Sequence, residues 1–504
     1  MSATRLDPET PGDRTHFQSG PKRVVTRSTV AIAFAAAAIG LLAAFLITFV
    51  PISGDEELPI LVGLTGVVLA IPIVIRVAIG RVDPFEPVVC FVFVWALMFI
   101  LKPLEILATG DSSLRDTFDV RPGLVPASVL GLIGATVFLL TYEIVLRRRR
   151  QRSQEPIYAS MRSTPDWSRQ PPPSWLVNGV IGLCALGMLT LAGASLTEIA
   201  ASGSSAYQYL IPLLATPAIL LLLLRSKSGS RAAAVGTAFL VVSSISFFVL
   251  YGQRAFILLP ISAVFIYIYL SQRKRPRWAV LGLISLLVVV PIFTVIEVAR
   301  ENPEQGLTAV FEEEDIASPR AALDRFASGD STAMFSALAL QMSTEGAIWD
   351  QKPGSEPISI VTRFVPKSLW PDKPRSSSEE LYSKYFPAHY ELNRAGTLFT
   401  LVSEFYYDSG IFGVIVGMSL VGWAYARLWL WVIARPRDPW RWAMYAPVWI
   451  SSTIAFRGDL ALTFGLGLFV FGPLLLGLWI SRRRVPADEG LNVDELGAGS
   501  PREA

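Results

Sequence analysis

The stretch GLVPASVLGLIGATVFLLTYEIVL occupies residues 123–146, and RRRR follows it at residues 147–150. An apolar run of about 20 residues is long enough to cross the hydrocarbon core of a bilayer as an α-helix. Arginines directly after such a run are typical of the cytoplasmic side of a membrane. This stretch therefore predicts a membrane-spanning helix whose C-terminal end lies in the cytoplasm.

Similar apolar runs recur along the 504 residues, of which 52% are hydrophobic and 17% charged. The mean hydropathy of +0.47 is too high for a soluble protein of this length. The composition predicts an all-α, polytopic membrane protein with about twelve transmembrane helices. They are expected at residues 29–50, 58–75, 87–101, 123–146, 175–197, 208–224, 232–250, 255–270, 279–297, 408–433, 442–456 and 460–481.

Basic residues mark alternate breaks between these runs, and the other breaks are mostly neutral or acidic. An even number of spans fits this alternation and places both termini in the cytoplasm. The basic breaks contain Arg76 and Arg81; Arg147 to Arg150 with Arg152; Arg225, Lys227 and Arg231; Arg273, Lys274, Arg275 and Arg277; Arg435, Arg437 and Arg441; and Arg482 to Arg484.

The polar segments divide the chain into five parts, of which a large extracytoplasmic loop is the most unusual. A polar insert of about a hundred residues in a compact membrane protein is typical of a functional segment. The expected parts are a disordered cytoplasmic tail (1–28), transmembrane helices 1–9 (29–297), the large extracytoplasmic loop (298–397), a re-entrant segment with transmembrane helices 10–12 (398–481), and a cytoplasmic tail (482–504).

The large loop carries signals for short helices. Helices are expected over residues 319–327, from about Asp330 to Ser343, and from Ser378 to a point before Pro387, because a capping residue begins each one. No part of the loop alternates as a strand does. The segment 396–408 is expected to be a re-entrant or interfacial helix, since another full crossing would invert every later basic loop.

Cationic side chains on the expected outer face are the first candidates for a site. Arg254 and Arg457 lie in very short breaks, and arginine is costly there unless it snorkels to the headgroups or pairs with an acid such as Asp459. One guanidinium group can bind two phosphate oxygens at once, so the fitting ligand is a lipid-linked pyrophosphate. The candidate pyrophosphate-binding residues are Arg254, Arg363, Lys367, Arg394 and Arg457.

His389 and Glu404 are the two candidates for a catalytic base, and the sequence leaves both open. Histidine titrates near neutral pH, and Asn393 lies on the same helical face four residues later. Cys90 and Cys184 fall within apolar runs and have no metal-ligand spacing, so no metal or cofactor is expected. The aromatic residues expected to be exposed, either to stack on sugars or to anchor the loop at the membrane interface, are Trp349, Trp370, Tyr382, Tyr385 and Tyr390.

The block RFVPKSLWPDKP at residues 363–374 resembles the outer loop of oligosaccharide repeat-unit polymerases of the O-antigen polymerase type. His389, Asn393, Glu404 and the Gly410-x-x-Gly413 spacing resemble a pattern that these enzymes share with O-antigen ligases. The resemblance covers roughly a quarter of the chain, and elsewhere it rests on topology.

The resemblance implies a metal-independent, inverting membrane glycosyltransferase of the C-type architecture in a bacterial cytoplasmic (inner) membrane. Its substrate would be an undecaprenyl-diphosphate-linked oligosaccharide. Arg254, Arg363 and Arg457 would hold the pyrophosphate, and His389 would take the acceptor proton. Membrane lipid, a chain-length regulator and a flippase are the implied partners, and no nucleic-acid partner is expected.

Three alternatives remain open. An O-antigen ligase is one, although the chain lacks the longer His/Asn-rich run of ligases. A glycosyltransferase that uses lipid-monophosphate sugars is another, with Asp55-Glu-Glu57 as base or metal ligand rather than as solvated acids. A lipid-linked oligosaccharide transporter is the non-enzyme alternative. It would need charges inside the bundle, whereas Arg76 and Glu143 lie near span ends and are not expected to form a relay.

Overall fold

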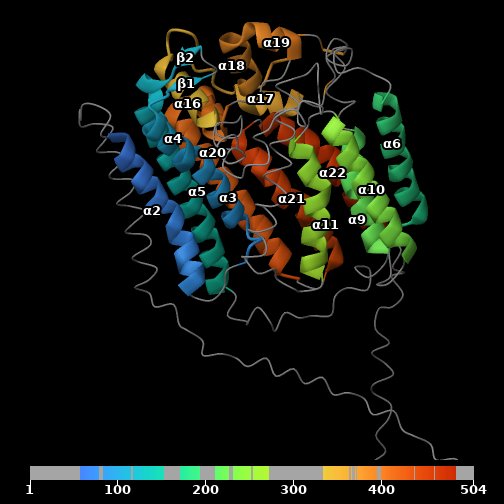
Figure 1. The fold of residues 1–504 in the computed structure, drawn as a ribbon. Coiled ribbons are helices and arrows are strands. Elements are labelled where there is room, and N and C mark those ends of the chain that lie inside the picture. The colour runs from blue at the N-terminus through green and yellow to red at the C-terminus, as the bar shows by residue number, and fades with distance from the viewer. Residues whose placement is uncertain are drawn as a thin grey trace, which may run out of the picture.

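The computed structural model is mostly helical, with a bundle of long helices below a cap of short ones (Figure 1). It describes residues 57–78, 83–114, 117–152, 171–192, 211–225, 231–250, 254–271, 333–362, 365, 369–370, 372–393, 399–435, 438–458 and 460–483.

The N-terminal described elements form one side of the bundle. Pro87 at the first helical position starts α3, and a π-helical turn joins α3 to α4. A short antiparallel hairpin of β1 and β2 then leads into α5. The elements are α2 (Glu57–Ala78), α3 (Pro87–Ala96), η1 (Leu97–Leu101), α4 (Lys102–Thr109), β1 (Ser113–Leu114), β2 (Phe118–Asp119), η2 (Arg121–Gly123) and α5 (Leu124–Arg152).

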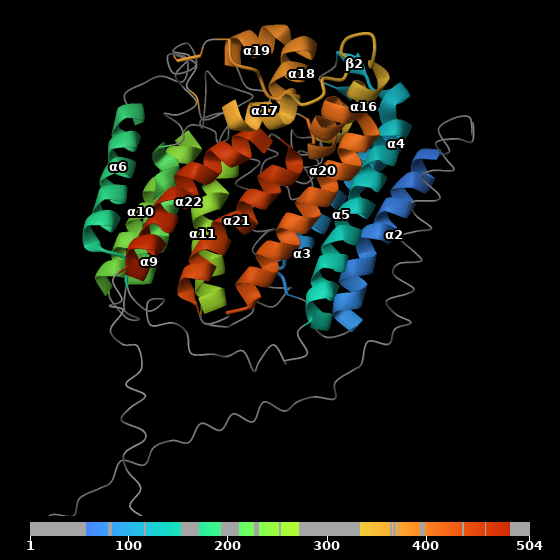
Figure 2. The ribbon, with the colours of Figure 1, turned by 180° about the vertical axis from the view of Figure 1, so that it is seen from behind.

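The remaining elements complete the bundle and the cap. The other side contains α6 (Ser174–Ala192), η4 (Ile211–Leu214), α9 (Ala215–Arg225), α10 (Arg231–Leu250) and α11 (Arg254–Ser271). The cap contains α16 (Ala333–Ser343), α17 (Ser355–Thr362), α18 (Ser377–Tyr385) and α19 (Pro387–Asn393). Three long helices return through the bundle (Figure 2): α20 (Leu401–Ile433), α21 (Pro439–Arg457) and α22 (Leu460–Arg483).

The described helices include five that are long and apolar enough to cross a membrane. These are Glu57–Ala78, Pro87–Thr109, Arg121–Arg148, Leu401–Ile433 and Thr463–Arg483. The other expected spans within the described residues also overlap with helices, and some of these helices are shorter than the expected spans. The expected spans at 29–50 and 279–297 lie outside the described residues. A mostly helical architecture with helices of membrane-spanning length is therefore confirmed, and the count of twelve stays a prediction.

Helix α20 packs closely against α5. A side chain at Gly422 of α20 would place its Cβ 2.6 Å from the carbonyl oxygen of Phe138 in α5, so only glycine allows this approach. The Phe138 ring stacks on Phe91 of α3, and Phe456 of α21 meets both rings edge-on. Such aromatic contacts join α3, α5 and α21 around one buried cluster.

Helix α20 consists of two straight parts joined at a kink. Ser409 and Gly410 leave the helical region, and Gly410 has φ +60° and ψ −148°, a conformation that favours glycine. Thr400 begins the first part by a capping box with Ser403. A short helix leading into a span at Gly410 was expected, and the kink lies at that residue.

Of the described cap helices, α16 and α18 agree with expected helices, and α17 and α19 were not expected. Helix α16 ends at Ser343 as expected, and α18 ends at Tyr385, before Pro387. The start of α18 differs, because Ser376 caps it and not Ser378. The expected helix at 319–327 lies outside the described residues, and the β1–β2 hairpin was not expected.

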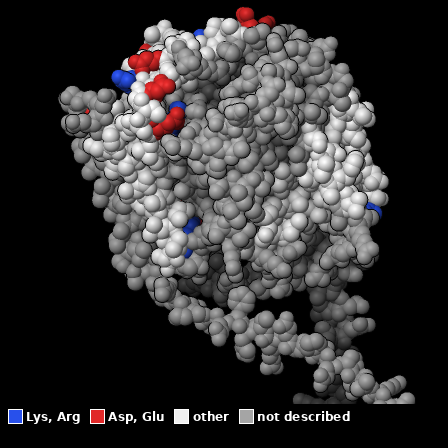
Figure 3. Space-filling view, viewed as in Figure 1, with Lys and Arg blue, Asp and Glu red and all other residues white. Residues whose placement is uncertain are grey.

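Charged side chains are unevenly distributed over the described surface. In Figure 3, acidic and basic groups gather over the cap end near α4 and the β1–β2 hairpin, while the side of the bundle below them is mostly uncharged. Exposed side chains on that side include Ile60, Val67 and Val74 of α2. Exposed apolar residues along one helix are typical of a lipid-facing surface.

Candidate functional site

Glu404 lies at the cap end of the bundle, in the first turn of α20, and its side chain is completely buried. Its Oε1 accepts a hydrogen bond of 2.7 Å from the Ser378 hydroxyl in α18. Its Oε2 accepts one of 3.2 Å from the backbone N–H of Leu460, the first residue of α22. A carboxylate at a helix N-terminus is stabilised by the helix dipole. Glu404 thus connects three elements that are distant in sequence.

Arg457 lies at the same end, in the last turn of α21, with a partly buried side chain. Gly458 ends this helix with φ +124°. A Cβ on Gly458 would lie 1.9 Å from the Phe399 carbonyl oxygen, just before α20. The end of α21 and the start of α20 therefore touch through backbone atoms, which brings Arg457 and Glu404 to one region.

His389 lies in α19, which packs on α18 above that region (Figures 1 and 2). The Tyr390 hydroxyl donates a 2.6 Å hydrogen bond to Glu379 and joins the two helices. His389 and Asn393 are four residues apart in α19. The His389 side chain is outside the described part of the structure.

Arg254 is the first residue of α11. Contacts of α11 with other helices show which of its ends is nearer the cap. Phe265 of α11 and Trp449 of α21 both contact Phe85 at the end opposite the cap, with ring centroids 6.2 and 5.9 Å away. At a rise of 1.5 Å per residue, Arg254 is about 16 Å from Phe265 along the helix. Since α11 extends from there along α21, its first residue lies toward the cap, as Arg457 does.

The remaining candidates, Arg363, Lys367 and Arg394, lie outside the described residues. The structure thus brings Glu404, Arg457, helix α19 and the start of α11 to one end of the bundle. These segments are far apart in sequence.

Several polar residues beside Glu404 were not expected from the sequence. Glu356 of α17 is buried, and its Oε2 accepts hydrogen bonds from the Ser377 N–H at 3.2 Å and the Ser377 hydroxyl at 2.7 Å. Adjacent serines, Ser377 and Ser378, therefore bind two buried glutamates from different helices. Asp408 accepts from the N–H of Glu356 at 3.2 Å. The serine run at residues 376–378 was the available signal, because serine hydroxyls at a helix start can also bind side chains.

Most of the aromatic residues expected to stack on sugars are buried, and that expectation is wrong for them. Trp349 is 1% exposed and donates to the Gln341 carbonyl at 2.9 Å. Tyr382 and Tyr385 are also buried, and burial raises the pKa of Tyr385 to about 12. Trp370 remains 42% exposed. The reason is that these rings pack on other aromatic rings of the protein, Trp349 on Tyr407 and Tyr385 on Phe399, which removes their apolar area from water.

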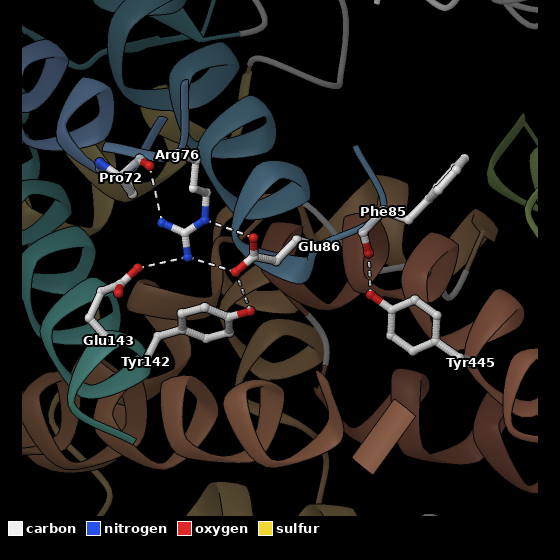
Figure 4. Close-up of polar contacts among 7 residues, drawn as sticks. All are labelled: Pro72, Arg76, Phe85, Glu86, Tyr142, Glu143 and Tyr445. Carbon is white, nitrogen blue, oxygen red and sulfur yellow. Dashed lines mark hydrogen bonds and ion pairs between the residues drawn. The ribbon is translucent and has the colours of Figure 1, made fainter. Parts of the chain in front are cut away.

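A second polar cluster lies inside the bundle at the end opposite the cap (Figure 4). Arg76 binds both oxygens of Glu86, through Nε at 2.7 Å and Nη2 at 2.6 Å. Its Nη2 also lies 2.7 Å from Glu143, and Tyr142 donates to Glu86 at 3.1 Å. Arg76 and Glu143 were not expected to form a relay, and the structure shows them as an ion pair. A buried guanidinium requires counter-charges, and these come from Glu86, the N-cap residue of α3, and from Glu143 of α5.

The acids at residues 55–57 are described only at Glu57. It is buried in the first turn of α2, where a carboxylate interacts favourably with the helix dipole. Among the described residues, no group of three or more His, Cys, Asp and Glu side chains is arranged to hold a metal ion. In comparisons with known proteins, no protein-family model, no curated protein and no solved structure matches this chain.

Proposed function

We propose that the chain is a membrane glycosyltransferase that polymerises undecaprenyl-diphosphate-linked oligosaccharide repeat units on the outer face of a bacterial cytoplasmic membrane. The observation that carries the proposal is the convergence of Glu404, Arg457, helix α19 and the start of α11 at the cap end. An anionic, membrane-bound substrate with a sugar group needs cations and a base together at such a surface.

In the proposed reaction, a hydroxyl oxygen of the acceptor repeat unit attacks the anomeric carbon of the donor. The bond from that carbon to the diphosphate oxygen breaks, and undecaprenyl diphosphate leaves with the electron pair. Arg254, Arg363 and Arg457, with Lys367 and Arg394, would hold the pyrophosphate oxygens. Cations at the developing charge stabilise the transition state.

His389 is proposed as the base that takes the acceptor proton, and Glu404 as a positioning residue. Both Glu404 oxygens accept hydrogen bonds within the protein, and the side chain is buried. A base must reach the proton it removes, which favours the histidine of α19. Glu404 would instead hold α18 and α22 in register below that helix.

The test is the fate of the lipid-linked repeat unit in a strain without the protein. Single repeat units on undecaprenyl diphosphate should accumulate in the outer leaflet, and the wild-type chain should restore long polymer. The Arg457→Ala variant should insert in the membrane without restoring polymer. Arg148→Ala, which changes an exposed arginine at the opposite end, is the matched control and should restore it. Full-length polymer with Arg457→Ala would refute the assignment.

A lipid-linked oligosaccharide transporter is the second candidate, and the Arg76 cluster favours it. Buried ionisable residues inside a membrane bundle are typical of transport pathways. A transporter predicts accumulation of the repeat unit in the inner leaflet of the same strain, so one leaflet assay separates the two candidates.

A further inference from the structure

A pocket opens between the last turns of α20 and the first turn of α21, at the end of the bundle opposite the cap. Its volume is about 430 Å³, and its lining residues are Arg427, Leu428, Trp431, Ala434 and Arg441. Two guanidinium groups and an indole beside apolar side chains form a surface that is both cationic and amphipathic. None of these residues belongs to the catalytic proposal.

The position of Arg427 follows from the exposed face of α20. Phe412, Val416, Leu420 and Trp423 are exposed at helical spacing along that face, and Arg427 is the next exposed residue on it. Phe412 and Trp423 are about 16 Å apart along the helix axis. An apolar stripe that ends in tryptophan and then arginine is typical of a helix face that leaves the hydrocarbon at the headgroups.

The charges of the pocket are only partly balanced within the described structure. Arg441 has Asp438 as a counter-charge, with Nε 3.4 Å from Oδ2, and it also donates to the Trp431 carbonyl. The guanidinium of Arg441 lies over the Trp431 ring, 4.9 Å from its centroid. Arg427 lies 6.0 Å from the Trp423 centroid and forms no ion pair with a described residue. The residues that line the pocket therefore carry a net positive charge.

We propose that this pocket binds the phosphodiester headgroup of an anionic phospholipid from the leaflet on the basic side of the membrane. Arg427 would bind the phosphate directly, Arg441 would add charge from the pocket wall, and Trp431 and Leu428 would contact the glycerol and upper acyl carbons. Basic pockets between membrane helices on the cytoplasmic side recognise such headgroups. Phospholipid is preferred to free phosphate because the pocket continues into the lipid-facing stripe.

The test compares lipid binding by the full chain and two variants, purified in detergent and examined by native mass spectrometry. Each protein is titrated with dioleoyl-phosphatidylglycerol and with zwitterionic dioleoyl-phosphatidylcholine. Arg427→Gln removes the phosphate contact. Arg483→Gln is the matched control, because Arg483 also stacks on a tryptophan at the same end, 3.9 Å from the Trp479 centroid, outside the pocket.

The wild type and Arg483→Gln should bind one phosphatidylglycerol in preference to phosphatidylcholine, and Arg427→Gln should bind it about five-fold more weakly. Equal binding by wild type and Arg427→Gln would overturn the proposal, as would an equal loss in Arg483→Gln. Displacement of the lipid by millimolar inorganic phosphate would overturn the choice of phospholipid. Equal melting temperatures of the three proteins would show that the comparison concerns binding and not folding.

Discussion

The carboxylate of Glu404 accepts a hydrogen bond from the backbone N–H of Leu460 at 3.2 Å, across 56 positions of the chain. This contact joins the start of α20 to the start of α22, and Ser378 of α18 completes it from the cap. Because the carboxylate is buried, both donors depend on it. The cap and the membrane helices are therefore connected at the proposed site by one side chain.

Glu404→Ala should destabilise the protein by about 2–4 kcal/mol, because the buried Ser378 hydroxyl and the partly buried Leu460 N–H lose their acceptor. Glu404→Gln keeps an acceptor oxygen and should cost less. The melting temperature of the detergent-purified variants measures both. Ser378→Ala supplies a double-mutant cycle, in which a coupling near zero with Glu404→Ala would contradict the contact.

Gly458→Ala should be strongly destabilising, at about 2–3 kcal/mol, since it combines φ +124° with a clash on the Phe399 carbonyl. Gly110→Ala is the matched control, because Gly110 has φ +72° and open space around its Cβ position. That variant should cost about 1 kcal/mol. Similar melting temperatures for the two variants would argue against the close backbone contact.

Arg76→Gln should cost about 3–5 kcal/mol, because it leaves buried carboxylates without their cation. Glu143→Gln should cost less, since Arg76 retains its two-point contact with Glu86. Thermal unfolding in detergent measures the difference. If Glu143→Gln were the more harmful change, Glu143 would be the principal partner of Arg76.

Lowering the pH should loosen the β1–β2 hairpin. Hydrogen bonds from the Arg121 N–H and the Ser112 hydroxyl lower the pKa of Asp119 below its usual 3.8. A folded-state pKa below the unfolded value means that the stabilisation is full above pH 3.8 and is lost as the pH falls further. In the wild type, the Val120 amide, which donates to the Ser112 carbonyl in the hairpin, should therefore lose protection from hydrogen exchange as the pH falls below 3.8. In Asp119→Asn the same amide should be weakly protected at every pH.

Arg457→Ala should lower chain extension by about a hundred-fold if its guanidinium stabilises the leaving diphosphate. Arg457→Lys should restore only part of the activity, because the two-point geometry is lost. Polymer length on gels measures both variants. His389→Ala should also abolish extension, and a variant that retained most of it would return the role of base to Glu404 or to the substrate.

Much of the fold was predictable because it depends on local sequence. Apolar runs with basic ends predicted the helices, since every backbone polar group in lipid must be satisfied within a helix. The alternation of basic breaks predicted a short helix leading into a span at Gly410, and the kink of α20 lies at that residue. Capping signals predicted α16 and α18 to within a few residues for the same local reason.

Contacts between distant segments were harder to predict from the sequence. The burial of Trp349 and Tyr385 depends on how the cap lies on the bundle, which no residue spacing reveals. The hairpin at residues 113–119 is too short to show a strand pattern. The pairing of Arg76 with Glu86 and Glu143 could be predicted only from the relative positions of the helices that carry them.

The amino-acid sequence by itself determined the helical membrane class and the candidate cations and bases, because hydropathy, charge and capping act over short distances along the chain. Only the tertiary structure decided that Glu404 is held by Ser378 and Leu460, that Arg457 lies beside the start of α20, and that Arg427 faces a pocket. The physical reason is that hydrogen bonds and close backbone contacts act over a few ångströms in space, and helix packing alone brings those atoms together.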